Sequence, residues 1–178
     1  MSLILQTLNS SQQQQDGKAL QFASTDLQND PKIRTLAAVQ QQARALKEAP
    51  EELKMDKEFI IMVMKANGRA LEHIGEEMKG DRELCMAAVA QDWLALEFVS
   101  QEMKGDRGLC MAAVTHEAGA IKHVSMELKN DEELVLRALE TYCECKRGTW
   151  SSVNKMCRIW DIPKEMGQSE RVRKAAGF

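Results

Sequence analysis

Apolar residues recur along most of this chain with the spacing of helix faces and not with the alternation of strands. In residues 81–105, Leu84, Ala88 and Val89 share one helix face. Further along, Leu96, Val99 and Met103 share another, at i, i+3 and i+7. Asp81 precedes the first face, where its carboxylate suits a helix N-cap. The pattern predicts pairs of short helices, each pair joined by a turn.

This pair of helices is a unit that repeats along the chain. Residues 81–105 and 106–130 are identical at 13 of 25 positions without a gap. The frame extends in both directions through a lysine in each unit, always two residues before an aspartate: Lys54, Lys79, Lys104 and Lys129. The unit that starts at Asp30 has one extra residue, and residues 16–29 resemble the second half of an earlier unit. We therefore expect helical repeats over residues 16–140.

The parts of one unit follow from its polar residues. A first helix begins after each aspartate, and the turn is clearest at Asn67-Gly68. The second helix carries an apolar triplet and ends at Gly80, Gly105 or Asn130, residue types that tolerate the left-handed conformation after a helix. Short helices cannot bury their apolar stripes alone, so neighbouring units must stack. The sequence predicts an all-α fold, a short α-solenoid of about five helix pairs.

Composition and charge narrow the function classes. Hydrophobic residues make up 44% of the chain but aromatic residues only 4%, and there are 11 methionines, which favours a helical core of aliphatic side chains. The net charge of −3 argues against a general nucleic-acid binder, which needs a basic surface. No apolar run is long enough to span a bilayer, and residues 1–8 do not form a signal peptide. A protein partner is expected, and a membrane complex is compatible with that role.

Five cysteines, an odd number, argue against a disulfide framework. Cys85 and Cys110 occupy equivalent positions in two units, as small buried apolar residues do. The alternative, structural disulfides, has less support. We expect an intracellular, reducing compartment, either the cytoplasm or an organelle interior.

No constellation of residues indicates a catalytic or metal site. Cys143, Cys145 and Cys157 supply three thiolates, but a fourth zinc ligand is missing nearby. The three histidines have no partner at a metal-ligand spacing, and phosphate loops and hydrolase motifs are absent. Paired carboxylates are frequent, but they recur with the repeat, which indicates a structural cause. We expect no cofactor, no bound metal and no enzymatic activity.

The two ends of the chain depart from the repeat. Residues 1–15 are an N-terminal cap or a polar segment, and no repeat is recognised in residues 141–178. That C-terminal segment contains Trp150, Trp160 and a basic cluster with Arg171 and Arg173. It is either a set of capping helices with a basic tail or a docking surface, because Trp and Arg are enriched in binding hot spots. Trp93, a large aromatic residue at a hairpin turn, is a further candidate partner-binding residue, with packing on a neighbouring turn as its alternative.

The phrases DKEFIIMVMKANGRALEHIGEEMKGD and DRELCMAAVAQDWLALEFVSQEMKGD closely resemble the domain-of-unknown-function 4116 repeat family. The resemblance covers residues 16–140. Asp92-Trp93 and Glu117-Ala118 depart from the Asn-Gly turn of the family, and residues 60–64 are bulkier than its Ala-rich segment. The resemblance implies a helical repeat array, found mostly in algae and other protists. It implies no established activity and no catalytic residues.

Three functions are compatible with these observations. The first is a non-enzymatic interaction module or scaffold that binds a protein partner along its stacked units. The second is a permanently bound accessory subunit of a larger assembly, such as an organelle or photosynthetic complex of an alga or protist. The third, an enzyme, is disfavoured by the absence of a recognisable site.

Overall fold

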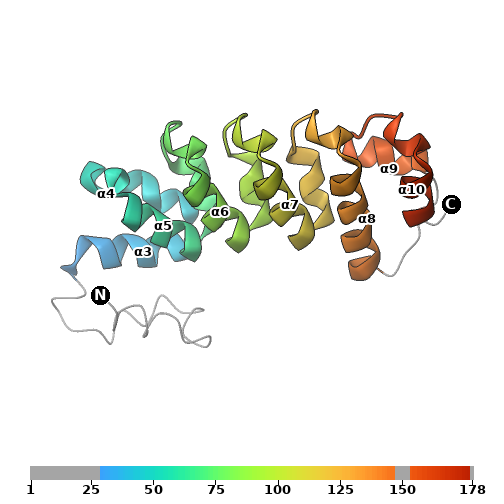
Figure 1. Cartoon of the computed structure of the whole chain (residues 1–178). Coiled ribbons are helices and arrows are strands. Elements are labelled where there is room, and N and C mark those ends of the chain that lie inside the picture. The colour runs from blue at the N-terminus through green and yellow to red at the C-terminus, as the bar shows by residue number, and fades with distance from the viewer. Residues whose placement is uncertain (1–28, 147–152, 177–178) are drawn as a thin grey trace.

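The computed structural model describes residues 29–146 and 153–176, and within them the chain is an extended all-α array (Figure 1). From α5 to η8, each unit holds one α-helix followed by two short 3-10 segments, which we label η. The elements in chain order are α3 (Pro31–Gln41), η2 (Ala43–Glu48), α4 (Glu51–Met55), α5 (Lys57–Ala66), η3 (Gly68–His73), η4 (Met78–Gly80), α6 (Arg82–Gln91), η5 (Trp93–Glu97), η6 (Met103–Gly105), α7 (Arg107–His116), η7 (Ala118–His123), η8 (Leu128–Asn130), α8 (Glu132–Lys146), α9 (Val153–Trp160), η9 (Met166–Gln168) and α10 (Glu170–Ala175). The predicted α-solenoid is confirmed.

The units stack in two layers. Helices α3, α5, α6, α7 and α8 contact one another in chain order and form one layer. The segments η2, η3, η5 and η7 do the same in the other layer. Contacts therefore run from each unit to its neighbours, as in other repeat proteins, and the apolar core lies between the two layers.

The α-helices begin where the sequence predicts. Asp56, Asp81 and Asp106 are N-caps whose carboxylates accept backbone N–H groups of the first turn. Each of these helices ends ten residues later, where an extended residue with φ near −150° turns the chain into the second layer. Asn67, Asp92 and Glu117 occupy that position in successive units.

The second helix of each unit is not continuous, which corrects the sequence analysis. The chain is extended at Ile74 (ψ 165°) and at Val124 (ψ 150°), between the two 3-10 segments of their units. The backbone N–H of Ser100 donates to the carbonyl of Lys79 in the preceding unit at 3.0 Å. The Ser100 hydroxyl accepts the N–H of Met103 at 3.2 Å and so starts a new turn. In the units that hold Ser100 and Ser125, a serine cap and a bond between units replace the helical hydrogen bonds at the break.

The expected left-handed residues at Gly80, Gly105 and Asn130 are also absent. Among non-glycine residues that the structure describes, only Asp161 has a positive φ, at 54°. Neither Gly80 nor Gly105 has a positive φ, and each stands last in a 3-10 turn. The chain leaves each turn through an extended aspartate, such as Asp81 (φ −78°, ψ 115°), so no left-handed residue is needed.

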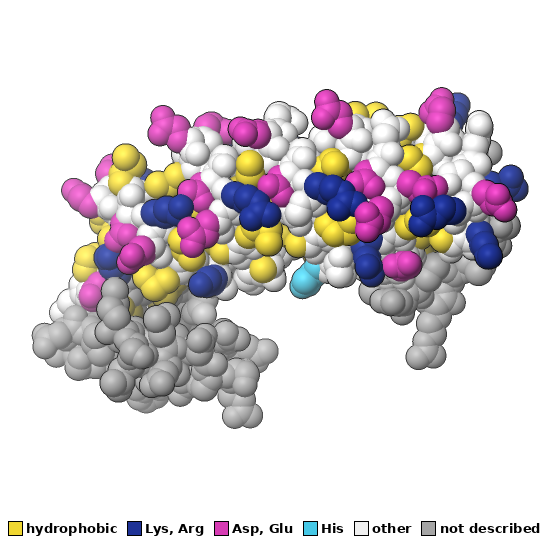
Figure 2. All heavy atoms as spheres, viewed as in Figure 1, with side chains coloured by type: hydrophobic (Ala, Val, Ile, Leu, Met, Phe, Trp, Pro, Cys, Tyr) yellow, Lys and Arg dark blue, Asp and Glu magenta, His cyan; other side chains and the backbone are white. Residues whose placement is uncertain are grey.

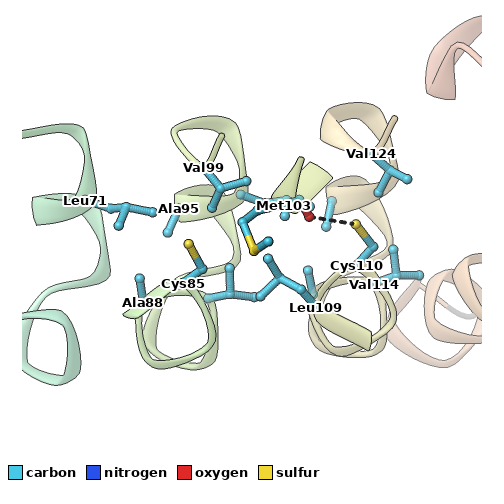
Figure 3. Packing of buried hydrophobic residues seen from close by; sticks show 14 of the residues in the cluster. Leu71, Cys85, Ala88, Ala95, Val99, Met103, Leu109, Cys110, Val114 and Val124 are labelled. Carbon is cyan, nitrogen blue, oxygen red and sulfur yellow. Dashed lines mark hydrogen bonds between the residues drawn. The ribbon is translucent and has the colours of Figure 1, made fainter. Parts of the chain in front are cut away.

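The core repeats with the units (Figure 3). Leu71, Leu96 and Ile121 are fully buried at equivalent positions of the 3-10 layer, and Leu84, Leu109 and Leu134 at equivalent positions of the α layer. The Cys85 and Cys110 thiols donate to the carbonyls of Lys79 and Lys104 at 3.2 and 3.3 Å. Burial raises the pKa of Cys85 to about 11 and that of Cys110 to about 12, so both thiols stay protonated near neutral pH.

Each unit ends with a hydrogen bond from the N–H of the next N-cap residue to the carbonyl three residues earlier, and this bond appears once more near the C-terminus. The N–H of Ser169 donates to the carbonyl of Met166 (3.2 Å), as Asp106 does to Met103 (3.1 Å). Ser169 caps α10 as the aspartates cap the earlier helices. No repeat is recognisable in the sequence after Glu140, because Ser169 lies farther from Asp131 along the chain than one period of the repeat.

The C-terminal helices continue both layers. Helix α10 contacts α8, and α9 contacts η7. The unit that begins at Asp131 therefore includes α8, α9 and η9, and α10 begins a last, partial unit that closes the array.

Candidate interaction surface

A ladder of ion pairs runs along the α layer. In each unit a basic side chain close behind the N-cap reaches the N-cap aspartate of the next unit. The pairs are Lys32–Asp56 (2.6 Å), Lys57–Asp81 (2.7 Å), Arg82–Asp106 (2.9 Å) and Arg107–Asp131 (2.6 Å). Figure 2 shows basic and acidic side chains interspersed along the array. The ladder thus joins neighbouring units on their solvent-facing side.

Each ladder aspartate has two roles, one for each oxygen. Asp106 Oδ1 accepts the Leu109 N–H at 2.7 Å and caps α7, while Oδ2 accepts from Arg82 Nε at 2.9 Å. The Leu109 N–H and Arg82 together lower the pKa of Asp106. Lys32 lowers the pKa of Asp56 and Lys57 that of Asp81, and Arg107 lowers the pKa of Asp131 although burial opposes it. The ionised carboxylates are therefore the stable form in the folded array.

The ladder predicts a loss of stability in acid. Because the folded state holds these carboxyl pKa values below the ordinary 3.8, the unfolded chain binds more protons as the pH falls. The free energy of unfolding should be level above about pH 5 and decrease as the pH falls through 3.8 to the lowered native values. Urea unfolding at constant ionic strength between pH 6 and pH 2.5 measures this.

The matched variant is the double substitution Asp81→Asn/Asp106→Asn, which keeps a capping oxygen at both positions but removes two ionisable groups. Its stability should depend less steeply on pH over the same range than that of the wild type. An equal slope in the two proteins would show that these carboxylates are not the source of the acid sensitivity.

A second set of contacts joins the hairpin turns. The Asn67 side chain donates to the Val39 carbonyl (2.9 Å) in the preceding unit, and Arg69 pairs with Asp92 (2.9 Å) in the next. The Gly68 N–H donates to Gln91 Oε1 at 2.6 Å. These bonds hold the turns in register, and sequence reasoning, which saw only a local breaker at Asn67-Gly68, did not predict them.

Trp93 lies at one of these turns and packs on the next unit. Its ring is tilted against His123 with 6.4 Å between the ring centroids. A Cβ atom on Gly119 would lie 3.5 Å from the Trp93 ring, so the tryptophan also covers the following turn. Burial lowers the pKa of His123 below 6.5 and keeps its imidazole neutral near pH 7. Trp93 is only partly buried, so its packing role leaves part of the ring exposed.

The C-terminal candidates separate into buried and exposed residues. Trp160 is 3% exposed, and its ring lies edge-on to that of Tyr142 with 6.0 Å between the ring centroids. The Arg171 side chain is 73% exposed and pairs with Glu132 at 2.8 Å. Arg173 is exposed on α10. Trp150 lies outside the described residues.

Within the described part of the chain, one recurring set of glutamates has no ion-pair partner. A glutamate stands just before η4, η6, η8 and η9, and Glu52 in α4 holds the equivalent place in an earlier unit. All are exposed, and we call this set the glutamate row: Glu52, Glu77, Glu102, Glu127 and Glu165. Acidic side chains recur at intervals along the upper edge of the array in Figure 2. The regular step from Glu52 to Glu127 was visible in the sequence, but only the structure distinguishes these free carboxylates from the paired ones of the ladder.

The described residues contain no group of three or more His, Cys, Asp or Glu side chains arranged to hold a metal ion. Cys157 is buried, whereas the side chains of Cys143 and Cys145 lie outside the described part. The Nδ1 atom of His73 is buried without a hydrogen-bond partner, and burial lowers the pKa of this histidine. Within the described ranges no helix has the length and apolar character needed to cross a membrane.

The repeat itself is what the chain shares with known sequences. The family model "Domain of unknown function (DUF4116)" matches four times in tandem, over residues 14–54, 35–79, 56–104 and 106–145. The chain belongs to this family. The match over residues 56–104 covers two stacked units, those of α5 and α6, and the last match ends at residue 145, before α9 and α10. No curated protein and no solved structure shows a significant similarity to the chain.

Proposed function

We propose that this DUF4116 protein is a non-enzymatic scaffold that binds a protein partner along its glutamate row. The observation that carries the proposal is the contrast between two sets of acidic side chains. The ladder aspartates and the carboxylates of Glu83, Glu132 and Glu133 are engaged between units. The five carboxylates of the glutamate row are exposed and form no ion pair with any residue that the structure describes.

The glutamate row contributes little to holding the array together. Packed helices lie about 8–10 Å apart, which is close to the screening length at physiological ionic strength. Repulsion between successive glutamates is therefore weak, and the fold tolerates the row at small cost. Its carboxylates remain available for basic groups of a partner.

The spacing of the row suggests the form of the partner. Seven residues of an α-helix span about 10.5 Å, close to the distance between stacked helices. A partner helix with Lys or Arg at every seventh position would present one cation to each unit. Several weak contacts of this kind act together when they lie on one rigid element.

A designed peptide tests the proposal directly. The probe is a helical peptide with lysines at every seventh position, and its control has the same composition with the lysines at other spacings. Fluorescence anisotropy at 0.15 M salt should show tighter binding of the first peptide. The variant Glu77→Gln/Glu102→Gln/Glu127→Gln should weaken its binding about tenfold, since exposed pairs contribute a few tenths to 1 kcal/mol each.

The matched variant is Glu48→Gln/Glu72→Gln/Glu97→Gln, which removes the same charge at three other exposed positions. These glutamates do not continue as a row, because Lys122 takes the place of Glu97 in the next unit. The variant should bind the peptide within about twofold of the wild type. Equal weakening by both variants, or equal binding of both peptides, would mean that only the overall negative charge attracts the probe, and the proposal would fail. Melting temperatures of the variants check that the fold is retained.

A further inference from the structure

We call the contact between the first helices of two successive units a joint. At the last joint of the array, between α8 and α10, the positions of the acidic and basic side chains are reversed. In three internal units the residue directly after the N-cap aspartate is basic: Lys57, Arg82 or Arg107. After Asp131 the same position holds Glu132. In the last unit a serine, Ser169, replaces the N-cap aspartate.

The reversed residues pair with each other. Arg171 Nη1 donates to Glu132 Oε2 at 2.8 Å, and the Ser169 hydroxyl donates to Glu132 Oε1. At the internal joints the earlier unit provides the cation and the later unit the carboxylate, as in Arg107–Asp131. At the last joint the earlier unit provides the carboxylate and the later unit the cation.

We propose that this reversal is a key that specifies which unit closes the array. A terminal unit placed after an internal one would bring Arg171 against Arg82 or Arg107. An internal unit placed after α8 would bring its N-cap aspartate against Glu132. Both wrong orders place like charges together, and opposite charges meet at every joint only when the terminal unit follows α8.

The array needs such a key because the buried apolar residues are nearly the same from one unit to the next. Leu84, Leu109 and Leu134 are fully buried at the same position of successive units. Two of the units are identical at more than half of their positions. Burial of apolar surface is non-directional and stabilises any unit that fits, whatever its place in the array. The charged residues at the joints therefore distinguish the terminal unit from the internal ones, which the core residues do not.

Three variants test the key, with hydrogen exchange of the α10 amides measured by NMR as the readout. The reporting amides are those of Arg173 and Ala176, which donate to the carbonyls of Ser169 and Val172. Glu132→Arg places a cation against Arg171, and Ser169→Asp places a carboxylate against Glu132. Each should speed exchange of these amides about fivefold, while the amides of α6 remain unchanged.

The third variant, Glu132→Arg/Ser169→Asp/Arg171→Gly, converts the last joint to the internal pattern of Arg82, Asp106 and Gly108. It should return exchange in α10 to within about twofold of the wild type. Glu140→Arg makes the same charge change elsewhere on α8 and should leave α10 unaffected. The proposal would be overturned if exchange of the α10 amides is unchanged in Glu132→Arg. It would also be overturned if these amides exchange as fast in the triple variant as in the single variants.

Discussion

Substitution of Gly68 by alanine should lower the free energy of unfolding by about 3 kcal/mol, because the added methyl group meets backbone. A Cβ atom at this position would lie 2.3 Å from the carbonyl oxygen of Ala88 in the next unit. The Gly68 N–H also donates to Gln91 of that unit. The carbonyl contact involves backbone and not a flexible side-chain end, so α6 would have to move away from the turn.

Gly75→Ala is the matched control, since a Cβ atom there meets nothing within 4 Å. That variant should be as stable as the wild type or slightly more so, because alanine restricts the unfolded chain. Guanidinium unfolding monitored by circular dichroism compares the two. Equal stability of both variants would show that the contact between Gly68 and Ala88 does not constrain the joint.

Truncation of Leu96 to alanine should cost about 2–5 kcal/mol. Leu96 is fully buried in η5, at the middle of the array, and neighbouring units hold Leu71 and Ile121 at the same position. The cavity would lie between the two layers, where stacked units support each other, and short segments have little stability alone. Urea unfolding followed by circular dichroism measures the loss.

Met55→Ala removes an apolar side chain that is 75% exposed and should change stability by less than about 0.5 kcal/mol. The two variants together test whether the core between the layers stabilises the array. A loss below about 1 kcal/mol for Leu96→Ala would contradict that description of the core.

The glutamate row and the keyed joint concern different parts of the molecule and can fail independently. The first depends on carboxylates that form no ion pair among the described residues, and its test measures binding of a basic helix. The second depends on Glu132, Ser169 and Arg171, and its test measures local opening of α10. Both proposals depend on which charged side chains form ion pairs between neighbouring units.

Much of the fold was predictable because the capping and apolar positions recur in successive units. Asp56, Asp81 and Asp106 were recognisable as N-caps, and each does cap an α-helix. The buried positions Leu84, Ala88 and Val89 also follow from helical periodicity. Local capping and helix-face patterns are properties of a short segment, so one sequence is enough to reveal them.

The second half of the unit was predicted less well. The triplet Leu96, Val99 and Met103 has helical spacing, and all three side chains are buried, yet the chain between them is not a continuous helix. The break depends on the bond from Ser100 to the Lys79 carbonyl of another unit. A periodicity within one segment carries no information about such a partner.

The candidate partner-binding residues divide in the same way. Aromatic and basic residue types drew attention to Trp93, Trp160 and Arg171, but residue type does not determine exposure. Trp160 is buried beside Tyr142, and Arg171 is engaged with Glu132. The regular glutamates cannot be singled out from the sequence, because a free carboxylate and a paired one have the same residue type.

The sequence alone determined the helical repeat, its period and the capping aspartates, because these depend on neighbours within a few residues. The tertiary structure alone decided which charges pair between distant parts of the chain, why the second helix breaks, and that α9 and α10 continue the two layers. Those features depend on the stacking of one unit against the next. Stacking brings together groups that are distant in the chain, and local periodicity does not specify them.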